Sequence, residues 1–369
     1  MSALDIETRD IDLVVVTGAG ASSQMGDPAF PLMKEWRKSL QSHLVKEVPQ
    51  FADLVGLNED IDGPEFERRL GDFLGQALNF TSSADLVTRS IELPFVSTTM
   101  NHHAVSEWLA HFGNALSRLS EEIYQSTFNE FGRNNLFKSK LAEESYGGLL
   151  RALNIRPNET MWALATTNYD HIAEVTLHLL GYSPFLGEDR VTGGGAKFRL
   201  NAKDLSKMAG PYRTPVFHLH GSIGWFLGSD GQSYGLDSVS RYDPSMGLPI
   251  MMLPNLSKDY GSISVITELW NEFRSVLRRA RSVFVLGHSL NDDQLCTALG
   301  QDVGDGRRIA IAQVTPNSDG PLRDRDELDL ATNLGVEYTP TIVPINFGHP
   351  IQEVTTKALA EWQRRMNTL

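Results

Sequence analysis

Polar and small residues follow apolar runs at four places in the chain, and their types could support chemistry. The stretches are TGAGAS (17–22), TTNYD (166–170), LHGS (219–222) and GHSL (287–290). The glycines of the first stretch would let backbone N–H groups approach a diphosphate. Asn168, Asp170 and His220 add an amide, a carboxylate and an imidazole that titrates near neutral pH. These groups suit the binding of a dinucleotide and the transfer of a proton beside it.

Each stretch also has a simpler structural explanation. Gly18 and Gly20 are as consistent with a tight strand-to-helix turn that binds nothing. Taken alone, His220 fits a buried structural histidine. Asp170 and Ser289 are residue types that cap helix N-termini, so both could serve local structure alone.

The elements that would position these residues form an alternating pattern. Strands are predicted where short apolar runs occur, at residues 12–17, 161–166, 214–219, 282–287, 308–314 and 339–344. Continuous rather than alternating apolar runs are typical of parallel strands buried on both faces. Helical stretches at 262–281 and 291–301 separate the later strands. The order predicts a Rossmann-like, doubly wound parallel sheet, whose carboxyl edge is where a dinucleotide would lie.

A large helical insertion is predicted between the first two strands, over residues 28–158. Three stretches there carry apolar residues at helical spacing, namely 64–79, 104–125 and 139–154. Residues 159–350 would supply the remainder of the sheet, with a loop-rich segment containing short strands at 226–260. We therefore expect residues 1–369 to form a single α/β domain with a helical subdomain.

Composition narrows the classes of function. The net charge of −13 argues against direct nucleic-acid binding through a basic surface. The single cysteine, Cys296, excludes an internal disulfide and any four-cysteine zinc site. The chain has no apolar run of about 18 residues that could span a membrane, and its acidic N-terminus does not resemble a signal peptide. A cytoplasmic protein without zinc or membrane contact is expected.

Taken in order, the four stretches resemble the motifs of the sirtuin family. GAGAS resembles its glycine-rich opening, TTNYD its TQNxD motif, LHGS its catalytic His-Gly and GHSL its later nucleotide-binding turn. The resemblance implies that NAD is bound, and it assigns the diphosphate to Gly18, Ala19, Gly20 and Ser22.

The same resemblance implies roles for the remaining site residues. Asn168 and Asp170 would address the nicotinamide ribose and carboxamide, with Thr167 beside them, and His220 would be the base near the ribose hydroxyls. Gly287 and Ser289 would contact the adenosine side. Asn168 and His220 are thus the expected catalytic residues.

Departures from the protein-deacylase branch point to another activity. With Cys296 alone, the chain cannot build the deacylases' zinc module, and the separation of Asn168 from His220 is longer than in those enzymes. The motif SLNDDQ and the helical insertion resemble the bacterial sirtuin-like NADases of anti-phage systems. That resemblance implies NAD hydrolysis on triggering, abortive infection by NAD depletion, homo-oligomerisation and a partner such as a HerA-type ATPase or helicase.

Three other functions remain open at this level. The chain could be a non-catalytic sensor or assembly subunit that binds NAD or ADP-ribose. It could be a zinc-free deacylase or ADP-ribosyltransferase, which would need an acceptor. A dehydrogenase is disfavoured because Ser23 occupies the third glycine position and no acidic ribose partner follows.

Further candidates are weaker. His103 and His111 lie about 12 Å apart along a helix, which is too far for one metal ion even with Glu107 between them. His218 is expected to share a strand face with His220, which leaves a supporting role beside it open. Trp225 and Phe226 would either close over a nicotinamide pocket or pack in the core.

Overall fold

The computed structural model of the chain describes about half of its residues, and the account below concerns those alone. They are residues 11–22, 33–49, 52–53, 56–57, 61, 65–66, 69, 121–127, 147, 150–151, 153–157, 159–189, 197–210, 212–228, 230–236, 246–252, 263–288, 290, 292–303, 308–314 and 342–347.

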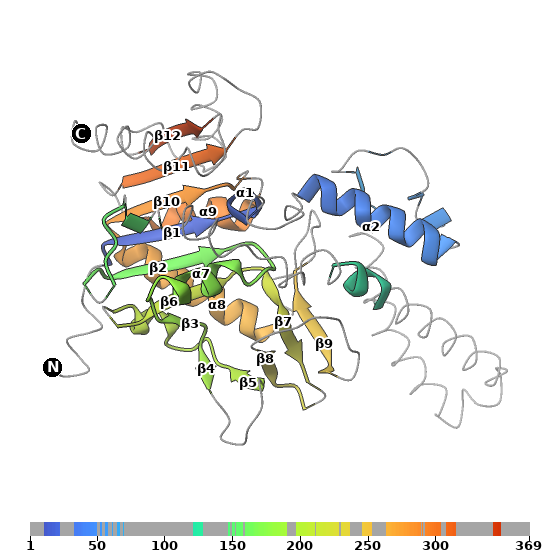
Figure 1. The fold of residues 1–369 in the computed structure, drawn as a ribbon, viewed down its shortest axis with the longest axis horizontal. Coiled ribbons are helices and arrows are strands. Elements are labelled where there is room, and N and C mark those ends of the chain that lie inside the picture. The colour runs from blue at the N-terminus through green and yellow to red at the C-terminus, as the bar shows by residue number, and fades with distance from the viewer. Residues whose placement is uncertain are drawn as a thin grey trace, which may run out of the picture.

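A parallel sheet organises the molecule (Figure 1). In the described part of the chain it has seven strands, in the spatial order β12 (Ile342–Phe347), β11 (Arg308–Val314), β10 (Ser282–Leu286), β1 (Leu13–Thr17), β2 (Trp162–Thr166), β6 (Thr214–His218) and β3 (Pro184–Phe185). Every pairing between neighbours is parallel. The predicted Rossmann-like α/β sheet is therefore confirmed.

The apolar runs located the strands well because burial on both faces selects continuous apolar sequence. All five residues of β1 and all five of β2 are buried. Five of the six predicted strands match observed strands to within a residue at each end. The sixth, predicted at 339–344, is β12 and lies three residues later. The short strand β3 has no apolar run of its own and was not predicted.

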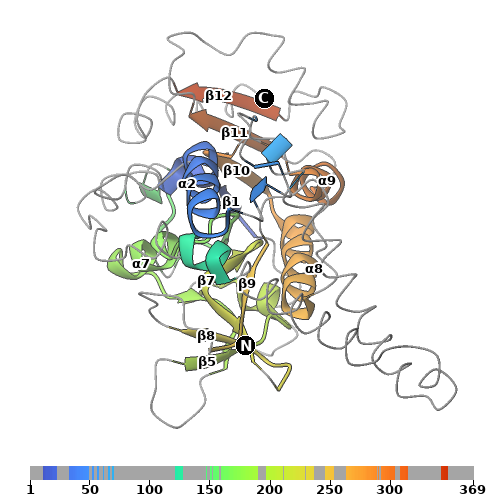
Figure 2. The same ribbon diagram turned by 90° about the vertical axis from the view of Figure 1, so that its right-hand side faces the viewer.

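Helices cover both faces of the sheet (Figure 2). The helices α8 (Ser264–Arg279) and α9 (Asp293–Asp302) lie on one face, and α7 (Ile172–Leu179) lies on the other. The predicted helices at 262–281 and 291–301 correspond to α8 and α9. A short 3-10 helix, η3 (Leu205–Met208), packs beside α8. No helix among the described residues is long and apolar enough to cross a membrane.

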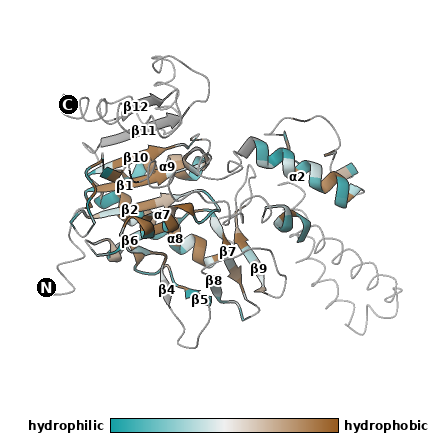
Figure 3. Cartoon of the chain, in the orientation of Figure 1, coloured by the Kyte–Doolittle hydropathy of each residue, from teal (hydrophilic) through white to brown (hydrophobic). Residues whose placement is uncertain are grey.

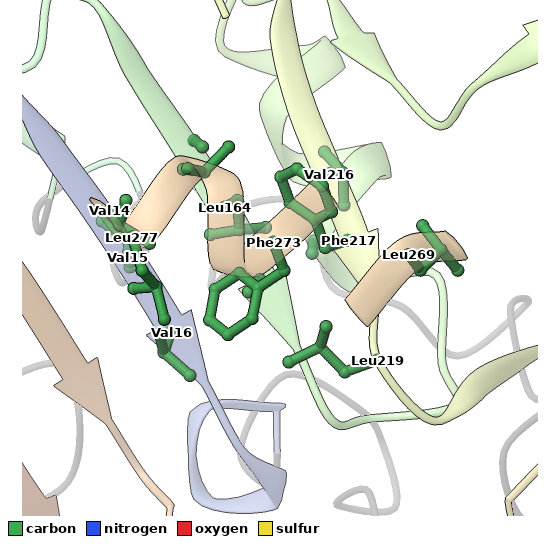
Figure 4. Close-up of a cluster of buried hydrophobic side chains, with 14 of the residues drawn as sticks. Val14, Val15, Val16, Leu164, Val216, Phe217, Leu219, Leu269, Phe273 and Leu277 are labelled. Carbon is green, nitrogen blue, oxygen red and sulfur yellow. The ribbon is translucent and has the colours of Figure 1, made fainter. Parts of the chain in front are cut away.

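The main hydrophobic core lies between the sheet and α8. Phe273 and Leu277 of α8 pack toward β1, β2 and β6, alongside Val15, Leu164 and Phe217 (Figure 4). These side chains are fully buried. Figure 3 shows that the strands beside this core consist mainly of hydrophobic residues, since β1 and β10 are hydrophobic almost throughout. This packing fixes the strand ends relative to one another.

A second, antiparallel sheet was not predicted. In the described residues it has the order β4 (Glu188–Asp189), β5 (Lys197–Leu200), β8 (Ser233–Leu236), β7 (Gly221–Leu227) and β9 (Leu248–Met251). Of the segment 226–260, predicted to be loop-rich with short strands, β8 and β9 are the described strands. Because β7 begins three residues after β6 ends, the two sheets are joined through the turn 219–220.

The predicted insertion at 28–158 is described only in part. The helix α2 (Met33–Glu47) lies on the carboxyl-edge side of the parallel sheet (Figures 1 and 2), and residues 121–127 are also helical. A second hydrophobic cluster joins Trp36, Leu40 and Leu44 of α2 to Tyr169 and Ile223. Most of the helices predicted at 64–79, 104–125 and 139–154 lie outside the described residues, so the extent of the insertion stays a prediction.

Candidate active site

The strand order brings the candidate residues to one place. From β1 the chain proceeds to β2 and β6 on one side, and it later returns through β10 on the other side. The reversal at β1 and β10 creates a topological switch point, where the loops after neighbouring strands diverge and leave a crevice. The loops that follow β1, β2, β6 and β10 all lie at this carboxyl edge.

The glycine-rich turn follows β1 directly. Gly18 donates its backbone N–H to Leu286 O at 2.9 Å, and the short helix α1 (Ala19–Ser22) begins at the next residue. A Cβ on Gly18 would lie 2.6 Å from Gly287 O and 2.8 Å from His288 Cα. Glycine is therefore required at position 18, because the loop after β10 comes so close to it. Gly287 in that loop has φ 62°.

Asn168 is held by its amide nitrogen. Nδ2 donates to Gly18 O at 3.0 Å and to Ser22 Oγ at 2.9 Å, which ties the loop after β2 to the loop after β1. The side chain is 6% exposed. Its oxygen, Oδ1, has no hydrogen-bond partner among the described residues. Among the described residues, Asn168 Oδ1 is thus an oriented acceptor that no donor contacts.

Asp170 lies on the other side of Ser22. Its Oδ1 accepts a hydrogen bond from Ile172 N at 3.0 Å and one from Ser22 Oγ at 3.4 Å. Burial raises the pKa of Asp170 to about 6, against the lowering effect of the Ile172 N–H. The prediction that Asp170 supports the start of the next helix is consistent with this bond to the first residue of α7. The carboxyl group is ionised at neutral pH but close to its titration range.

A buried polar cluster supports this loop from beneath. His218 Nδ1 donates to Asn168 O at 3.3 Å, and His218 Nε2 donates to Glu174 Oε1 at 3.0 Å. Both partners are acceptors, so both ring nitrogens carry hydrogen and the ring is an imidazolium. His171 Nδ1 lies 3.3 Å from the same Glu174 oxygen, and its Nε2 lies 3.1 Å from Ser222 Oγ.

The electrostatics of this pair agree with the geometry. Burial acts to lower the pKa of His218, but the charge of Glu174 and the hydrogen bond to it outweigh burial, and the pKa is raised. Burial likewise acts to raise the pKa of Glu174, and the charge and hydrogen bond of His218 lower it instead. The pair is therefore ionised and fixes the backbone at Asn168.

The position of His220 corrects one prediction. The strand β6 ends at His218, and His220 lies in the two-residue turn before β7 rather than on the strand. His218 and His220 consequently do not share a strand face, because the chain has turned between them. His220 Nε2 donates to Asp292 Oδ2 at 2.8 Å, so its partner is on α9 and not in the cluster around Glu174.

The remaining predicted residues are distributed as follows. Thr167 donates its N–H to Thr17 O at 3.1 Å, which joins the loops after β1 and β2. Ala19 and Gly20 lie in α1, directly after β1 at the carboxyl edge of the sheet. Ser289 lies outside the described residues, as do His103, Glu107 and His111.

Trp225 and Phe226 are core residues. Each is 1% exposed, and the Trp225 ring packs against His218 with centroids 5.4 Å apart. The alternative in which they close over a pocket is therefore wrong for this conformation.

Sequence reasoning missed the roles of Asp292, Glu174 and Ser222. The sequence placed Asp292 in the motif SLNDDQ and Ser222 in the stretch LHGS without giving either a partner, and Glu174 gave no signal. Their partners lie on other elements, 72, 44 and 51 residues away respectively. Within the described part of the chain, no group of three or more histidine, cysteine, aspartate or glutamate residues is placed so that it could hold a metal ion.

Comparison with known proteins gives one family match. Residues 163–338, just under half of the chain, match the family model of the SIR2-like domain. This segment contains Asn168, Asp170 and His220, whereas the glycine-rich turn precedes it. No curated protein matches the chain.

Several solved structures of sirtuins are similar over nearly the whole chain. A Sir2 homologue in complex with NAD has 14% identity and a TM-score of 0.38, with 99% of this chain and 94% of that chain covered. Sir2Tm bound to a propionylated peptide has 12% identity and a TM-score of 0.38, with coverage of 98% and 97%. A structure from work on the mechanism and regulation of Sir2 enzymes has 12% identity and a TM-score of 0.41, with coverage of 98% and 96%.

Proposed function

We propose that this chain hydrolyses NAD at the nicotinamide N-glycosidic bond and releases nicotinamide and ADP-ribose. One observation carries the proposal. The amide of Asn168 bridges the glycine-rich turn at Gly18 and Ser22, and it leaves an oriented acceptor at the carboxyl edge of a doubly wound sheet. The SIR2-like match to residues 163–338 and the sirtuin-like order of the motifs support NAD as the ligand.

The glycine-rich turn suits the diphosphate. A phosphate needs backbone N–H groups without side chains in front of them. The Cβ that Gly18 lacks would collide with the loop at Gly287, so the close approach of the two loops requires glycine at position 18. The close approach supports assignment of the diphosphate to Gly18, Ala19, Gly20 and Ser22.

The reaction needs no acid at the leaving group. When the C1′–N bond breaks, its electron pair neutralises the pyridinium nitrogen, and nicotinamide leaves as a neutral molecule. Water adds its oxygen to C1′ of the oxocarbenium-like ribose and gives up one proton. The protein must therefore orient the ribose, hold the leaving amide and accept the proton.

The candidate residues divide these tasks. Asn168 Oδ1 accepts a hydrogen bond from a ribose hydroxyl or from the attacking water. Asp170, ionised above its pKa of about 6, accepts from the carboxamide N–H of nicotinamide. His220 accepts the proton as general base, which is worth roughly 10²–10⁴-fold in rate. Gly287 and Ser289 would face the adenosine side.

The biological setting follows from the resemblance to bacterial sirtuin-like NADases of anti-phage systems. The protein would act in the cytoplasm and deplete NAD on infection, as a homo-oligomer with a partner such as a HerA-type ATPase. Uncontrolled turnover would kill the host cell, so we expect the isolated chain to be slow or inhibited.

The test is nicotinamide release from NAD by the purified chain, beside Asn168→Ala and His220→Ala. The matched control is His178→Ala, because His178 is exposed on the same helix as Glu174 and lies away from the carboxyl edge. Each protein is assayed alone, at high protein concentration and with extract from phage-infected cells. Release that is lost in the two site variants and kept in the control supports the proposal.

Two other outcomes would overturn it. NAD binding without release under every condition would favour the sensor or assembly subunit. Release only in the presence of an acceptor peptide or protein would favour a zinc-free deacylase or ADP-ribosyltransferase.

A further inference from the structure

The partner of His220 is a carboxylate that has two separate tasks. Asp292 is the N-cap of α9, where its Oδ1 accepts from Leu295 N at 2.9 Å. Its Oδ2 accepts from His220 Nε2 at 2.8 Å. We propose that Asp292 is a positioning residue for the proposed reaction, and that it fixes the tautomer and orientation in which His220 accepts a proton.

The cap alone does not explain the residue type. A helix N-cap uses one side-chain oxygen, and Ser or Asn would serve about equally well. Asp292 is 6% exposed, and a buried carboxylate is unfavourable unless its oxygens are paired. The second oxygen is paired with the imidazole, so the aspartate is explained by His220 and not by the helix.

The backbone around His220 is already fixed. His220 O accepts from Met252 N at 2.7 Å, and Leu219 N donates to Thr166 O at 2.9 Å. Trp270 Nε1 also donates to Leu219 O at 3.0 Å. The turn is thus anchored to β2, to α8 and to Met252 beside β9, and the hydrogen bond to Asp292 Oδ2 restricts rotation of the His220 ring.

The tautomer follows from the chemistry of the partner. A carboxylate only accepts hydrogen bonds, so Nε2 of His220 must carry the hydrogen. In the neutral ring the proton-accepting nitrogen is then Nδ1. An adjacent carboxylate also stabilises the imidazolium that forms when Nδ1 takes the proton from water or from a ribose hydroxyl. This inference rests on the proposed function, in which His220 is the base.

Asp292→Asn is the decisive variant because the helix cap controls how the new amide lies. Leu295 N–H requires an oxygen, so the amide oxygen stays at the cap and its NH₂ group faces His220 Nε2. Nε2 must then accept, and the hydrogen moves to Nδ1. Asp293→Asn is the matched control, because Asp293 is the exposed neighbour in the same first turn.

Two measurements are made on the full chain. The first is kcat and KM for nicotinamide release under the condition in which the wild type is active. The second is the pair of ¹⁵N shifts of the His220 ring by NMR, assigned with His220→Ala. Asp292→Asn is expected to lower kcat by roughly 10²–10⁴-fold with KM changed by less than about threefold, and to move the hydrogen from Nε2 to Nδ1. Asp293→Asn is expected to match the wild type in both.

An unchanged tautomer, or an unchanged kcat in a folded Asp292→Asn protein, would overturn the inference. The NMR comparison does not need turnover, so it separates the two proposals. If the wild type releases no nicotinamide, the proposed hydrolase fails, while the ring shifts still decide whether Asp292 orients His220. If the wild type is active and its ring carries hydrogen on Nδ1, the hydrolase stands and the positioning role fails.

Discussion

Replacement of Asp170 by Asn should make the protein more stable at neutral pH while it impairs the proposed activity. The isosteric amide keeps an oxygen to accept from Ile172 N and Ser22 Oγ, so the local hydrogen bonds survive. What changes is the charge, which the wild type carries in a site that is 3% exposed.

The sign and size of the expected change in unfolding free energy follow from the pKa of Asp170. Burial raises the pKa of Asp170 from 3.8 to about 6, so the folded state binds this proton more tightly than the unfolded chain. The contribution to folding is therefore fully present below about pH 4 and is lost as the pH rises through 6. At about 1.4 kcal/mol per tenfold change in proton affinity, the loss is about 3 kcal/mol. Asn is neutral throughout and avoids it.

The assay is urea denaturation of both proteins between about pH 4 and pH 7. The difference in unfolding free energy should be near zero at the acidic end and should approach about 3 kcal/mol in favour of Asp170→Asn at neutral pH. Asp293→Asn, an exposed acid, should show no such trend. A difference that stays flat with pH would mean that the charge of Asp170 is not destabilised by burial, and would refute the reasoning.

Three further perturbations test the packing around the site. Gly18→Ala should destabilise the fold by roughly 1–3 kcal/mol and weaken NAD binding, because its Cβ would collide with the backbone at Gly287; urea denaturation and a titration with NAD check both effects. Glu174→Gln should cost about 3–5 kcal/mol in the same denaturation assay, because it leaves the buried charge of His218 unpaired, and an unchanged midpoint would contradict the ion pair. Trp225→Ala should cost about 3–5 kcal/mol as a core truncation, whereas a raised KM for NAD at unchanged stability would restore the pocket-closing role.

Much of the parallel sheet could be predicted because burial on both faces leaves a pattern that can be recognised in the sequence alone. The runs that became β1, β2, β6, β10 and β11 are continuous and apolar because helices cover both faces of the sheet. Three strands of the antiparallel sheet, β4, β5 and β8, lack that signature. The strands β4 and β5 have only two and four residues, and β5 alternates exposed and buried positions over just two repeats. Such strands are defined by their neighbours and not by their own composition.

The turn at His220 shows a finer limit. The run 214–219 predicted a strand through Leu219, but β6 ends at His218 and the turn 219–220 leads into Gly221, which has φ 77°. A Cβ at Gly221 would lie 2.0 Å from Ile250 O, so the turn depends on a contact with β9. The two residues are 29 positions apart in the chain, and no local sequence pattern predicts their contact. The conclusion that His220 lies at the carboxyl edge was right, although its place on a strand was wrong.

The order of the strands in the sheet could not be predicted from a single sequence, and this order determines which candidate residues become neighbours. The residue types after each strand were visible, so Asn168, Asp170 and His220 could be chosen one by one. Their partners could not, because the chain visits β2 and β6 before it places β10 on the far side of β1. The position of β10 beside β1 brings the loop at Gly287 against Gly18 and places Asp292 next to His220. His220, Asp292 and the glycine-rich turn become neighbours only because the strand order reverses between β1 and β10, and such a reversal is where α/β sheets bind dinucleotides.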